Sequence, residues 1–406
     1  MDCFHVVREL HRLGHEVRLF GLAEADSWER GAFDSEGLPF PAMRVAVGRR
    51  ELGDAPERLR AAVAAWGPDV VLVGDGFFLK PLVIEALAAW PVIARYYAYE
   101  AICHRDILHF KEGAPCPLNY FETPEVCRRC ALEAMAPMLK RGLRTAWVDE
   151  YLAARAYAPE YYVRAAQALE RVRAFVVYNE LMAAQLRRFP GKAIIAPGGV
   201  DLETFGESGV WSLESGGPEL RTQNSEPSTS PHSQPVILMS GRAEDPVKGA
   251  EVLLYAGRRL AEKRDDFLIK ITMPLDTPRT PWFEPVGWQL HSEMQRLYAE
   301  AAVCVVPSLW DEPFGMVAVE AMAAGCPVCA SRVGGLQHIV EHGRTGFLFE
   351  RGNSAELAQQ LAQLLDDPAL RHEMGRAARA RVEQEYSWAR VVSRYYLPLL
   401  ERIGDE

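Results

Sequence analysis

The sequence predicts an α/β protein with two doubly wound domains, each a parallel sheet covered by helices on both faces. Three observations lead to this prediction. The chain has 406 residues, more than the roughly 250–300 that usually share one hydrophobic core. Helical patterns alternate with short apolar strands in two separate series. Between the two series lies a stretch rich in Ser, Gly, Pro and Glu, residues 206–234.

The first series opens with an amphipathic helix. Apolar residues recur at helical spacing from Cys3 to Leu13, and Gly14 is placed to end the helix. The later elements are expected as strands at residues 17–20, 68–75 and 92–98 and helices at residues 56–66 and 80–89. Strands this short and apolar are typical of a sheet that is buried on both faces.

The start of the chain departs from the usual pattern, because a doubly wound domain normally begins with a strand. We therefore expect the N-terminal domain to lack its first strand, which is usually central, and to leave two strand edges unpaired. Two explanations are open: Met1 is not the natural start of the protein, or another segment fills the gap.

The stretch at residues 206–234 contains few large apolar side chains. Such a composition buries too little surface to offset the entropy lost on ordering. We expect a flexible linker or insertion here, within an interdomain segment at residues 191–235.

The second series follows this segment. Its strands are expected at residues 236–242, 267–273, 303–308 and 326–331, with helices between them and a long helical tail. The two series together predict two Rossmann-like domains, at residues 1–190 and 236–385.

Charge and hydropathy exclude several classes of protein. The formal net charge of −10 argues against a general nucleic-acid binder, whose surface would be basic. No apolar run reaches the roughly 18 residues of a spanning helix, and the N-terminus does not have the pattern of a secretory signal. These features predict a cytoplasmic protein. Its eight cysteines are then expected as thiols or metal ligands rather than disulfides.

Two carboxylates, Glu312 and Glu320, mark the candidate site. The expected strand at residues 303–308 ends just before Glu312, and ligands of open parallel sheets bind at the carboxyl ends of strands. A helix that opens at Gly315 would offer free backbone N–H groups to an anion. About 12 Å of helix axis would separate the carboxylates, too far for an acid/base pair. A ligand with a phosphate between two hydroxyl-bearing ends fits this arrangement.

The spacing of the two glutamates occurs by chance in many helices, but their surroundings are more specific. The segment SLWDEPFGMVAVEAMAAGCPVCASRVGG resembles the signature of retaining glycosyltransferases of family 4, which have the GT-B architecture. Three other segments resemble that family: MSGRAEDPVKGAEVLLYA, APGGVDLETF and VGGLQHIVEHGRTGFLF. The resemblance covers almost the whole chain outside the low-complexity stretch.

The resemblance implies that a sugar moves, with retention at its anomeric carbon, from a nucleotide-diphosphate-sugar donor to an acceptor. Arg242 and Lys248 match the two cations that hold the donor diphosphate, in a motif that includes Gly241. Glu320 matches the family's ribose-binding glutamate, and Glu312 matches the glutamate that meets the transferred sugar. Further donor contacts are implied at the backbone of Phe314, Gly315, Met316 and Val317 and in a base-binding loop with Val286, Gly287 and Trp288. Simple packing is the competing explanation for that tryptophan.

The resemblance also implies how the domains divide the work. Residues 1–190 would hold the acceptor, residues 236–385 the donor, and a C-terminal helix at residues 386–406 would return to the first domain. The acceptor is left open as a glycan, a lipid-linked sugar or a small molecule, and a lipid-linked acceptor would bring peripheral membrane contact. No Asp-x-Asp metal motif follows a strand, which agrees with the resemblance. The resemblance implies that protein cations rather than a divalent metal ion hold the phosphates, so that catalysis requires no cofactor.

A cysteine-bearing insertion is expected at residues 103–130. A pair spaced as CxxC together with two further thiols can supply four tetrahedral ligands to a structural zinc ion. The candidate ligands are Cys103, Cys116, Cys127 and Cys130, with His104 as an alternative. Scattered thiols in a loop are the competing explanation, and a subset of family 4 resembles this region.

Two other functions stay open. The lacking strand motivates a non-catalytic nucleotide-sugar-binding or partner protein. A nucleotide-sugar epimerase of the same architecture is the second alternative, against which the EPFG segment argues.

Overall fold

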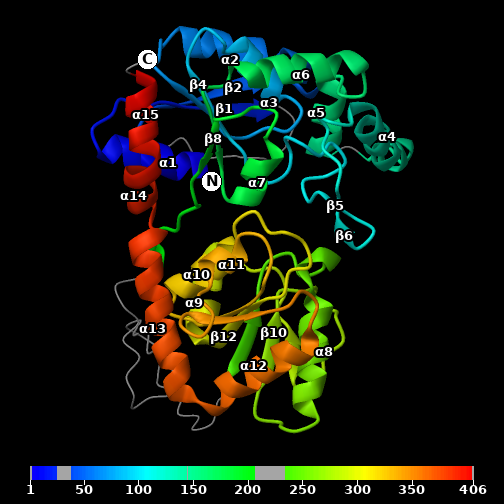
Figure 1. Ribbon diagram of the computed structural model, residues 1–406, viewed down its shortest axis with the longest axis vertical. Helices are drawn as coiled ribbons and strands as arrows, with labels where there is room; N and C mark the ends of the chain where they lie inside the picture. The colour runs from blue at the N-terminus through cyan, green and yellow to red at the C-terminus, as the bar shows by residue number, and fades with distance from the viewer. Residues whose placement is uncertain (1, 25–37, 144, 206–233, 405–406) are drawn as a thin grey trace. The chain divides into compact units, whose positions relative to one another are not determined.

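The computed structural model describes residues 2–24, 38–143, 145–205 and 234–404. The chain forms two compact units, shown in Figure 1. Unit 1 comprises Met1–Pro197 together with Trp388–Glu406, and unit 2 comprises Gly198–Ser387. Most of the stretch that the sequence predicts as a linker, residues 206–233, lies outside the described residues.

Unit 2 is built on one sheet of six parallel strands in the order β11-β10-β9-β12-β13-β14. The strands are β9 (Val236–Met239), β10 (Leu268–Ile271), β11 (Phe283–Pro285), β12 (Ala301–Val306), β13 (Val328–Ser331) and β14 (Gly346–Phe349). The helices are α8 (Ala250–Ala261), α9 (His291–Glu300), α10 (Met316–Ala323), α11 (Leu336–Ile339), α12 (Ser354–Asp366) and α13 (Pro368–Glu385).

The core of unit 2 lies between the sheet and its helices. Leu253 of α8 and Leu361 of α12 are fully buried in one cluster with Ile269 and Val303 of the strands. The strand order reverses between β9 and β12. In open parallel sheets the ligand binds outside the carboxyl ends of the strands at such a reversal.

Unit 1 has a smaller parallel sheet in the order β3-β4-β7-β8 and a separate parallel pair, β1-β2. The strands are β1 (Leu19–Glu24), β2 (Ala42–Val47), β3 (Val71–Val73), β4 (Val92–Arg95), β7 (Ala174–Val177) and β8 (Ala193–Ile195), with a short antiparallel pair of β5 (Phe110–Lys111) and β6 (Ala114–Pro115). The helices are α1 (Asp2–Arg12), α2 (Ala55–Ala64), α3 (Lys80–Ala86), α4 (Pro124–Lys140), α5 (Ala146–Ala153), α6 (Pro159–Arg171), α7 (Glu180–Gln185), α14 (Trp388–Val391) and α15 (Leu397–Gly404).

The sheet of unit 1 is split between β1 and β3. Among the described residues, β1 pairs with β2 alone and β3 pairs with β4 alone. Residues of β1, β3 and α1 line a cavity of about 1830 Å³. Among the described residues, one edge of β1 and one edge of β3 thus have no strand partner, and two such edges are what the sequence predicts.

The end of the chain packs on its beginning within unit 1, as the red α14 and blue α1 in Figure 1 show. Trp388 is buried, and its ring stacks on His5 with 5.1 Å between ring centroids. Val6 and Leu10 of α1 belong to the same apolar cluster as Val391 and Leu399. Burial of these side chains is what holds α1 against the sheet.

Candidate functional site

Glu312 lies in the loop that follows β12. Its side chain is largely buried, and its Oε1 accepts hydrogen bonds from Lys248 Nζ and Ser308 Oγ, both at 2.7 Å. Lys248 Nζ also lies over the ring of Trp310, 4.9 Å from its centroid. The structure therefore brings together two of the predicted site residues, which are 64 positions apart in the chain.

Two glycines allow the chain to pack tightly behind Glu312. A Cβ added to Gly334 would lie 2.1 Å from the carbonyl oxygen of Glu312, and one added to Gly335 would lie 2.4 Å from that of Phe314. The N–H of Gly335 donates to the Glu312 carbonyl at 2.7 Å. Only glycine permits this approach, so the pair fixes the path of the loop.

The loop leads into α10 at Gly315, whose φ of +121° strains any residue with a Cβ. Met316 and Val317 occupy the first two positions of the helix. Their backbone N–H groups have no acceptor inside the helix, and the positive end of the helix dipole lies there. This end of α10 is suited to bind an anion such as a phosphate.

Glu320 lies one and a half turns into α10 and is half-buried. Its Oε2 accepts a hydrogen bond from the hydroxyl of Tyr298 at 3.0 Å. The same hydroxyl lies 2.8 Å from Ser240 Oγ. Ser240 follows β9, so three separate segments meet at this carboxylate.

Gly241 and Arg242 follow Ser240 at the carboxyl end of β9. Gly241 has a φ of +99°, and a Cβ there would lie 3.7 Å from Val317 Cγ2, so this loop lies against the start of α10. The Arg242 side chain is exposed and forms no ion pair with any described residue. A guanidinium in this state remains available to a phosphate.

Val286, Gly287 and Trp288 follow β11, two strands from β9 in the sheet. The N–H groups of Val286 and Gly287 donate to the carbonyl oxygens of Ile271 and Met273, at 2.9 Å each. Trp288 is 72% exposed, so packing does not explain this tryptophan. An exposed indole ring can stack on a base.

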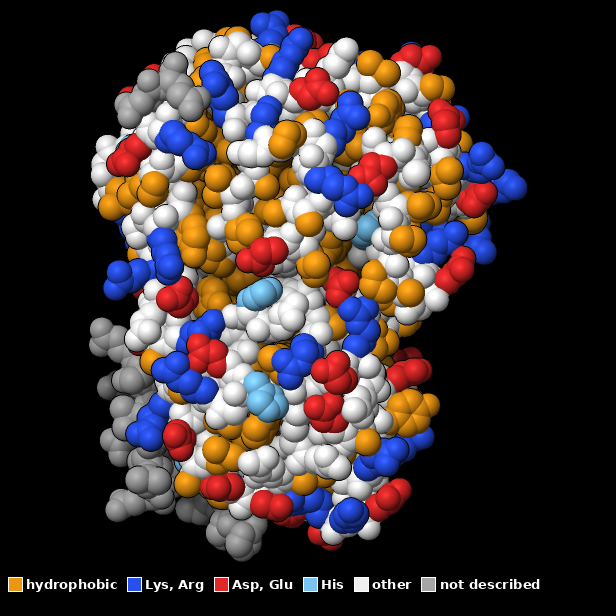
Figure 2. Space-filling view, viewed as in Figure 1, with side chains coloured by type: hydrophobic (Ala, Val, Ile, Leu, Met, Phe, Trp, Pro, Cys, Tyr) orange, Lys and Arg blue, Asp and Glu red, His pale blue; other side chains and the backbone are white. Residues whose placement is uncertain are grey.

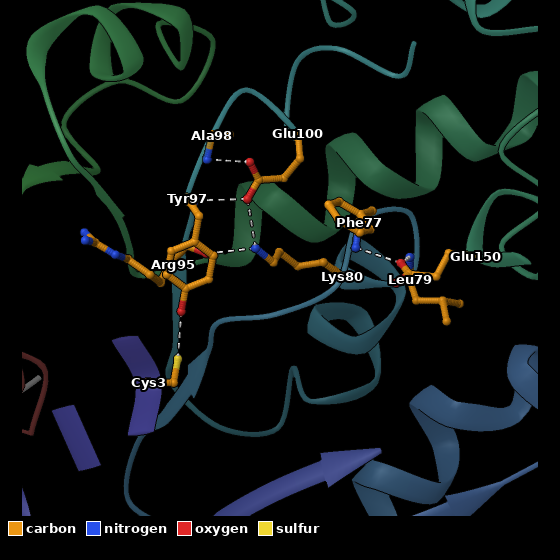
Figure 3. Close-up of polar contacts among 9 residues, drawn as sticks. All are labelled: Cys3, Phe77, Leu79, Lys80, Arg95, Tyr97, Ala98, Glu100 and Glu150. Carbon is orange, nitrogen blue, oxygen red and sulfur yellow. Dashed lines mark hydrogen bonds and ion pairs between the residues drawn. The ribbon is translucent and has the colours of Figure 1, made fainter. Parts of the chain in front are cut away.

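A second polar cluster lies in unit 1, at the carboxyl ends of β3 and β4, and is drawn in Figure 3. The buried Lys80 donates to the carbonyl of Arg95 at 2.8 Å and to Glu100 at 3.4 Å. Glu100 also accepts hydrogen bonds from the N–H groups of Tyr97 and Ala98.

Nothing in the sequence pattern singles out this cluster, because Lys80 opens a helix that looks ordinary. Both buried charges are satisfied by the partners described, which is what such groups require. Glu150 adds to the same region by accepting from the N–H groups of Phe77 and Leu79 at 2.7 and 3.2 Å (Figure 3). These contacts fix the loops that follow β3 and β4.

The four cysteines predicted as zinc ligands are free and half-buried. Over the described parts of the chain, no group of three or more His, Cys, Asp or Glu side chains is arranged to hold a metal ion. Burial raises the pKa of Cys103 to about 12. The residues as placed do not fit a metal, and the zinc site stays a prediction that metal analysis of the purified protein would test.

His104, the alternative zinc ligand, packs in an aromatic cluster. Its ring stacks on Tyr120 with 3.6 Å between centroids and meets Phe78 and Tyr161 edge-on. Its Nδ1 is buried without a hydrogen-bond partner among the described residues. Burial lowers the pKa of His104 to about 3, so the ring is neutral at pH 7.

The folded protein is expected to lose stability below pH 6.5 because of His104. The unfolded chain takes up a proton at an ordinary pKa of about 6.5, whereas the folded ring stays neutral until pH about 3. The full stability is therefore present above pH 6.5, and the loss reaches about 2 kcal/mol at pH 5. Urea unfolding measures the free energy of unfolding at pH 7 and at pH 5. The difference between the two values should be about 2 kcal/mol smaller in His104→Phe than in the wild type.

The exposed His15 provides the control for that experiment, since His15→Gln should keep the wild-type pH dependence. If His104→Phe unfolds with the same difference between pH 7 and pH 5 as the wild type, His104 is not the group responsible.

A protein-family model matches part of the chain. Residues 284–381 match the model described as glycosyl transferases group 1. This segment contains Glu312, Glu320 and the residues from Val286 to Trp288, while Arg242 and Lys248 lie before it.

Curated relatives match parts of the chain. A D-inositol 3-phosphate glycosyltransferase from Pseudarthrobacter chlorophenolicus is 35% identical over 214 residues, which cover 49% of this chain and 48% of that protein. A glycogen synthase from Mycobacterium tuberculosis is 41% identical over 108 residues, covering 27% of this chain and 26% of that protein. The match to the first of these relatives thus spans about half of its length.

Solved structures match nearly the whole chain. Sucrose-phosphate synthase from Thermosynechococcus elongatus aligns with a TM-score of 0.62 and 21% identity, covering 98% of this chain and 91% of that one. A glycosyltransferase from Rickettsia africae aligns with a TM-score of 0.61 and 15% identity, covering 99% of this chain and 94% of that one. Anabaena Alr3699/HepE in complex with UDP aligns with a TM-score of 0.58 and 15% identity, covering 90% of this chain and 87% of that one. These likenesses show the fold, two α/β units with parallel sheets.

Proposed function

We propose that this chain moves a sugar from a nucleotide-diphosphate-sugar donor to an acceptor. The family match and the curated relatives support a group 1 glycosyltransferase of the GT-B architecture. One observation carries the proposal. Glu312 and Lys248 meet 2.7 Å apart beside the strand ends of unit 2, in the loop that leads into α10 and Glu320. The finer assignment, to family 4 and to its subset with a cysteine insertion, rests on the resemblance of the sequence motifs.

In the proposed complex, each part of the donor has its own partner. Arg242, Lys248 and the first N–H groups of α10 hold the diphosphate, whose negative charge grows as it departs. Glu320 accepts hydrogen bonds from the ribose hydroxyls, and Glu312 accepts them from the transferred sugar. Trp288 and its neighbours hold the base.

Retention at the anomeric carbon is part of the proposal and comes from the sequence resemblance. We expect no metal ion to be needed for the transfer, since Arg242 and Lys248 supply positive charge to the leaving group. The anomeric configuration of the product, read by NMR, tests the first point, and turnover in the presence of a chelator tests the second.

The acceptor is proposed to be a sugar, free or lipid-linked, that binds to residues of unit 1. Over the described residues, no helix is both long enough and apolar enough to span a bilayer. On the face drawn in Figure 2, basic and acidic side chains alternate without an extended basic area among the described residues. The absence of a nucleic-acid partner and the cytoplasmic location stay predictions.

A donor screen by thermal shift tests the proposal. The chain should be stabilised by one class among uridine, guanosine and adenosine diphosphate sugars. A ligand at about 100 times its dissociation constant should add about 2.7 kcal/mol to the free energy of unfolding. No stabilisation by any of the three classes would contradict the proposed function.

A non-catalytic nucleotide-sugar-binding protein is the second candidate. Such a protein would give the same stabilisation by a donor but no turnover. A hydrolysis and transfer assay with the stabilising donor separates the two candidates.

A further inference from the structure

Tyr298 lies beneath the proposed ribose site, on α9, and is 2% exposed. Its hydroxyl is the middle member of a chain of three groups, 2.8 Å from Ser240 Oγ and 3.0 Å from Glu320 Oε2. The three residues come from the end of β9, from α9 and from α10. No motif of the sequence singles out Tyr298.

The direction of these hydrogen bonds follows from the number of protons. A phenol has one proton, and the Tyr298 hydroxyl donates it to Glu320. Ser240 must then donate its own proton to the Tyr298 oxygen. Burial, and next the charge of Glu320, raises the pKa of Tyr298 well above its ordinary value, so the phenol stays a donor at neutral pH.

We propose that Tyr298 is a positioning residue, which holds the carboxylate of Glu320 in the orientation that accepts hydrogen bonds from a ribose. The hydrogen bond from Tyr298 to one oxygen of Glu320 restricts the rotamers of the Glu320 side chain before any ligand is bound. The side chain therefore loses less conformational entropy when the nucleotide binds. Ser240 directly precedes Gly241 and Arg242, so the same chain ties the diphosphate loop to the ribose carboxylate. This inference rests on the proposed function, which places a ribose at Glu320.

The test is Tyr298→Phe, which removes one oxygen and keeps the ring. Calorimetric titration would compare UDP, GDP or ADP, whichever binds the wild type, with the 2′,3′-dideoxy form of the same nucleotide. We expect the ribonucleotide to bind about tenfold more weakly to the variant, the scale of one hydrogen bond to a charged group. The dideoxy form, which has no ribose hydroxyls to recognise, should bind the variant and the wild type equally.

Tyr255→Phe is the matched control, because Tyr255 lies on α8 of the same unit and is 53% exposed. It should leave both affinities unchanged, while Ser240→Ala should weaken ribonucleotide binding in the same sense as Tyr298→Phe.

Two results would overturn the inference while leaving the proposed function intact. In one, Tyr298→Phe binds the ribonucleotide as tightly as the wild type. In the other it loses affinity for both nucleotides equally, as a purely structural role would require. A wild type that binds none of UDP, GDP and ADP would overturn the proposed function and this inference with it.

Discussion

Replacement of Arg242 by alanine is expected to lower kcat by about 10²- to 10³-fold, the scale of about 2.7–4 kcal/mol seen when a preorganised group that stabilises developing charge is removed. In the proposed reaction the leaving diphosphate gains negative charge as the sugar departs. The loop that carries Arg242 lies against the start of α10, because a Cβ on the preceding Gly241 would lie 3.7 Å from Val317 Cγ2. Turnover of the donor selected by the screen, with product quantified at saturating donor, measures the effect. Because Arg242 forms no ion pair among the described residues, the melting temperature should not change.

Arg259→Ala is the control, because this arginine is exposed on α8 of the same unit. Lys248→Ala should differ from Arg242→Ala by also lowering the melting temperature, since it leaves the largely buried Glu312 without its cation. Wild-type kinetics in Arg242→Ala would refute the assignment of this residue to the diphosphate.

Replacement of Gly249 by alanine is expected to reduce the free energy of unfolding by about 3 kcal/mol and to abolish turnover with it. Gly249 has a φ of +76°, and a Cβ there would lie 2.0 Å from the carbonyl oxygen of Pro307. The backbone at the end of β12 would have to move, and with it the loop that carries Glu312. Lys248, the preceding residue, would be displaced as well. Denaturant unfolding and donor turnover measure the two effects.

Gly343→Ala separates the clash from backbone strain. Gly343 has a similar φ of +80° in the same unit, but no atom lies within 4 Å of an added Cβ. It should therefore lose only about 1–2 kcal/mol, the cost of the left-handed conformation. Equal losses in the two variants would show that the contact with Pro307 does not matter.

The fold class and most elements could be predicted from the sequence, because apolar periodicity is a local property. The helix expected at residues 56–66 is found as Ala55–Ala64, and the strand expected at residues 92–98 is found as Val92–Arg95. The strands β2, β7, β8, β11 and β14 were not predicted. The predicted pair of strand edges without a partner is found at β1 and β3 among the described residues.

By itself, the sequence determined which residue types follow the strands. These include the glycine pair, the glutamates, and the arginine and lysine of the predicted site. Only the tertiary structure decided which of them meet. Lys248 pairs with Glu312 across 64 positions, and Tyr298 reaches Glu320 across 22. The buried Lys80 and Glu100 likewise become partners only in the folded chain. The physical reason is that a motif depends on neighbours along the chain, whereas a hydrogen bond or ion pair depends on how strands and helices pack in space.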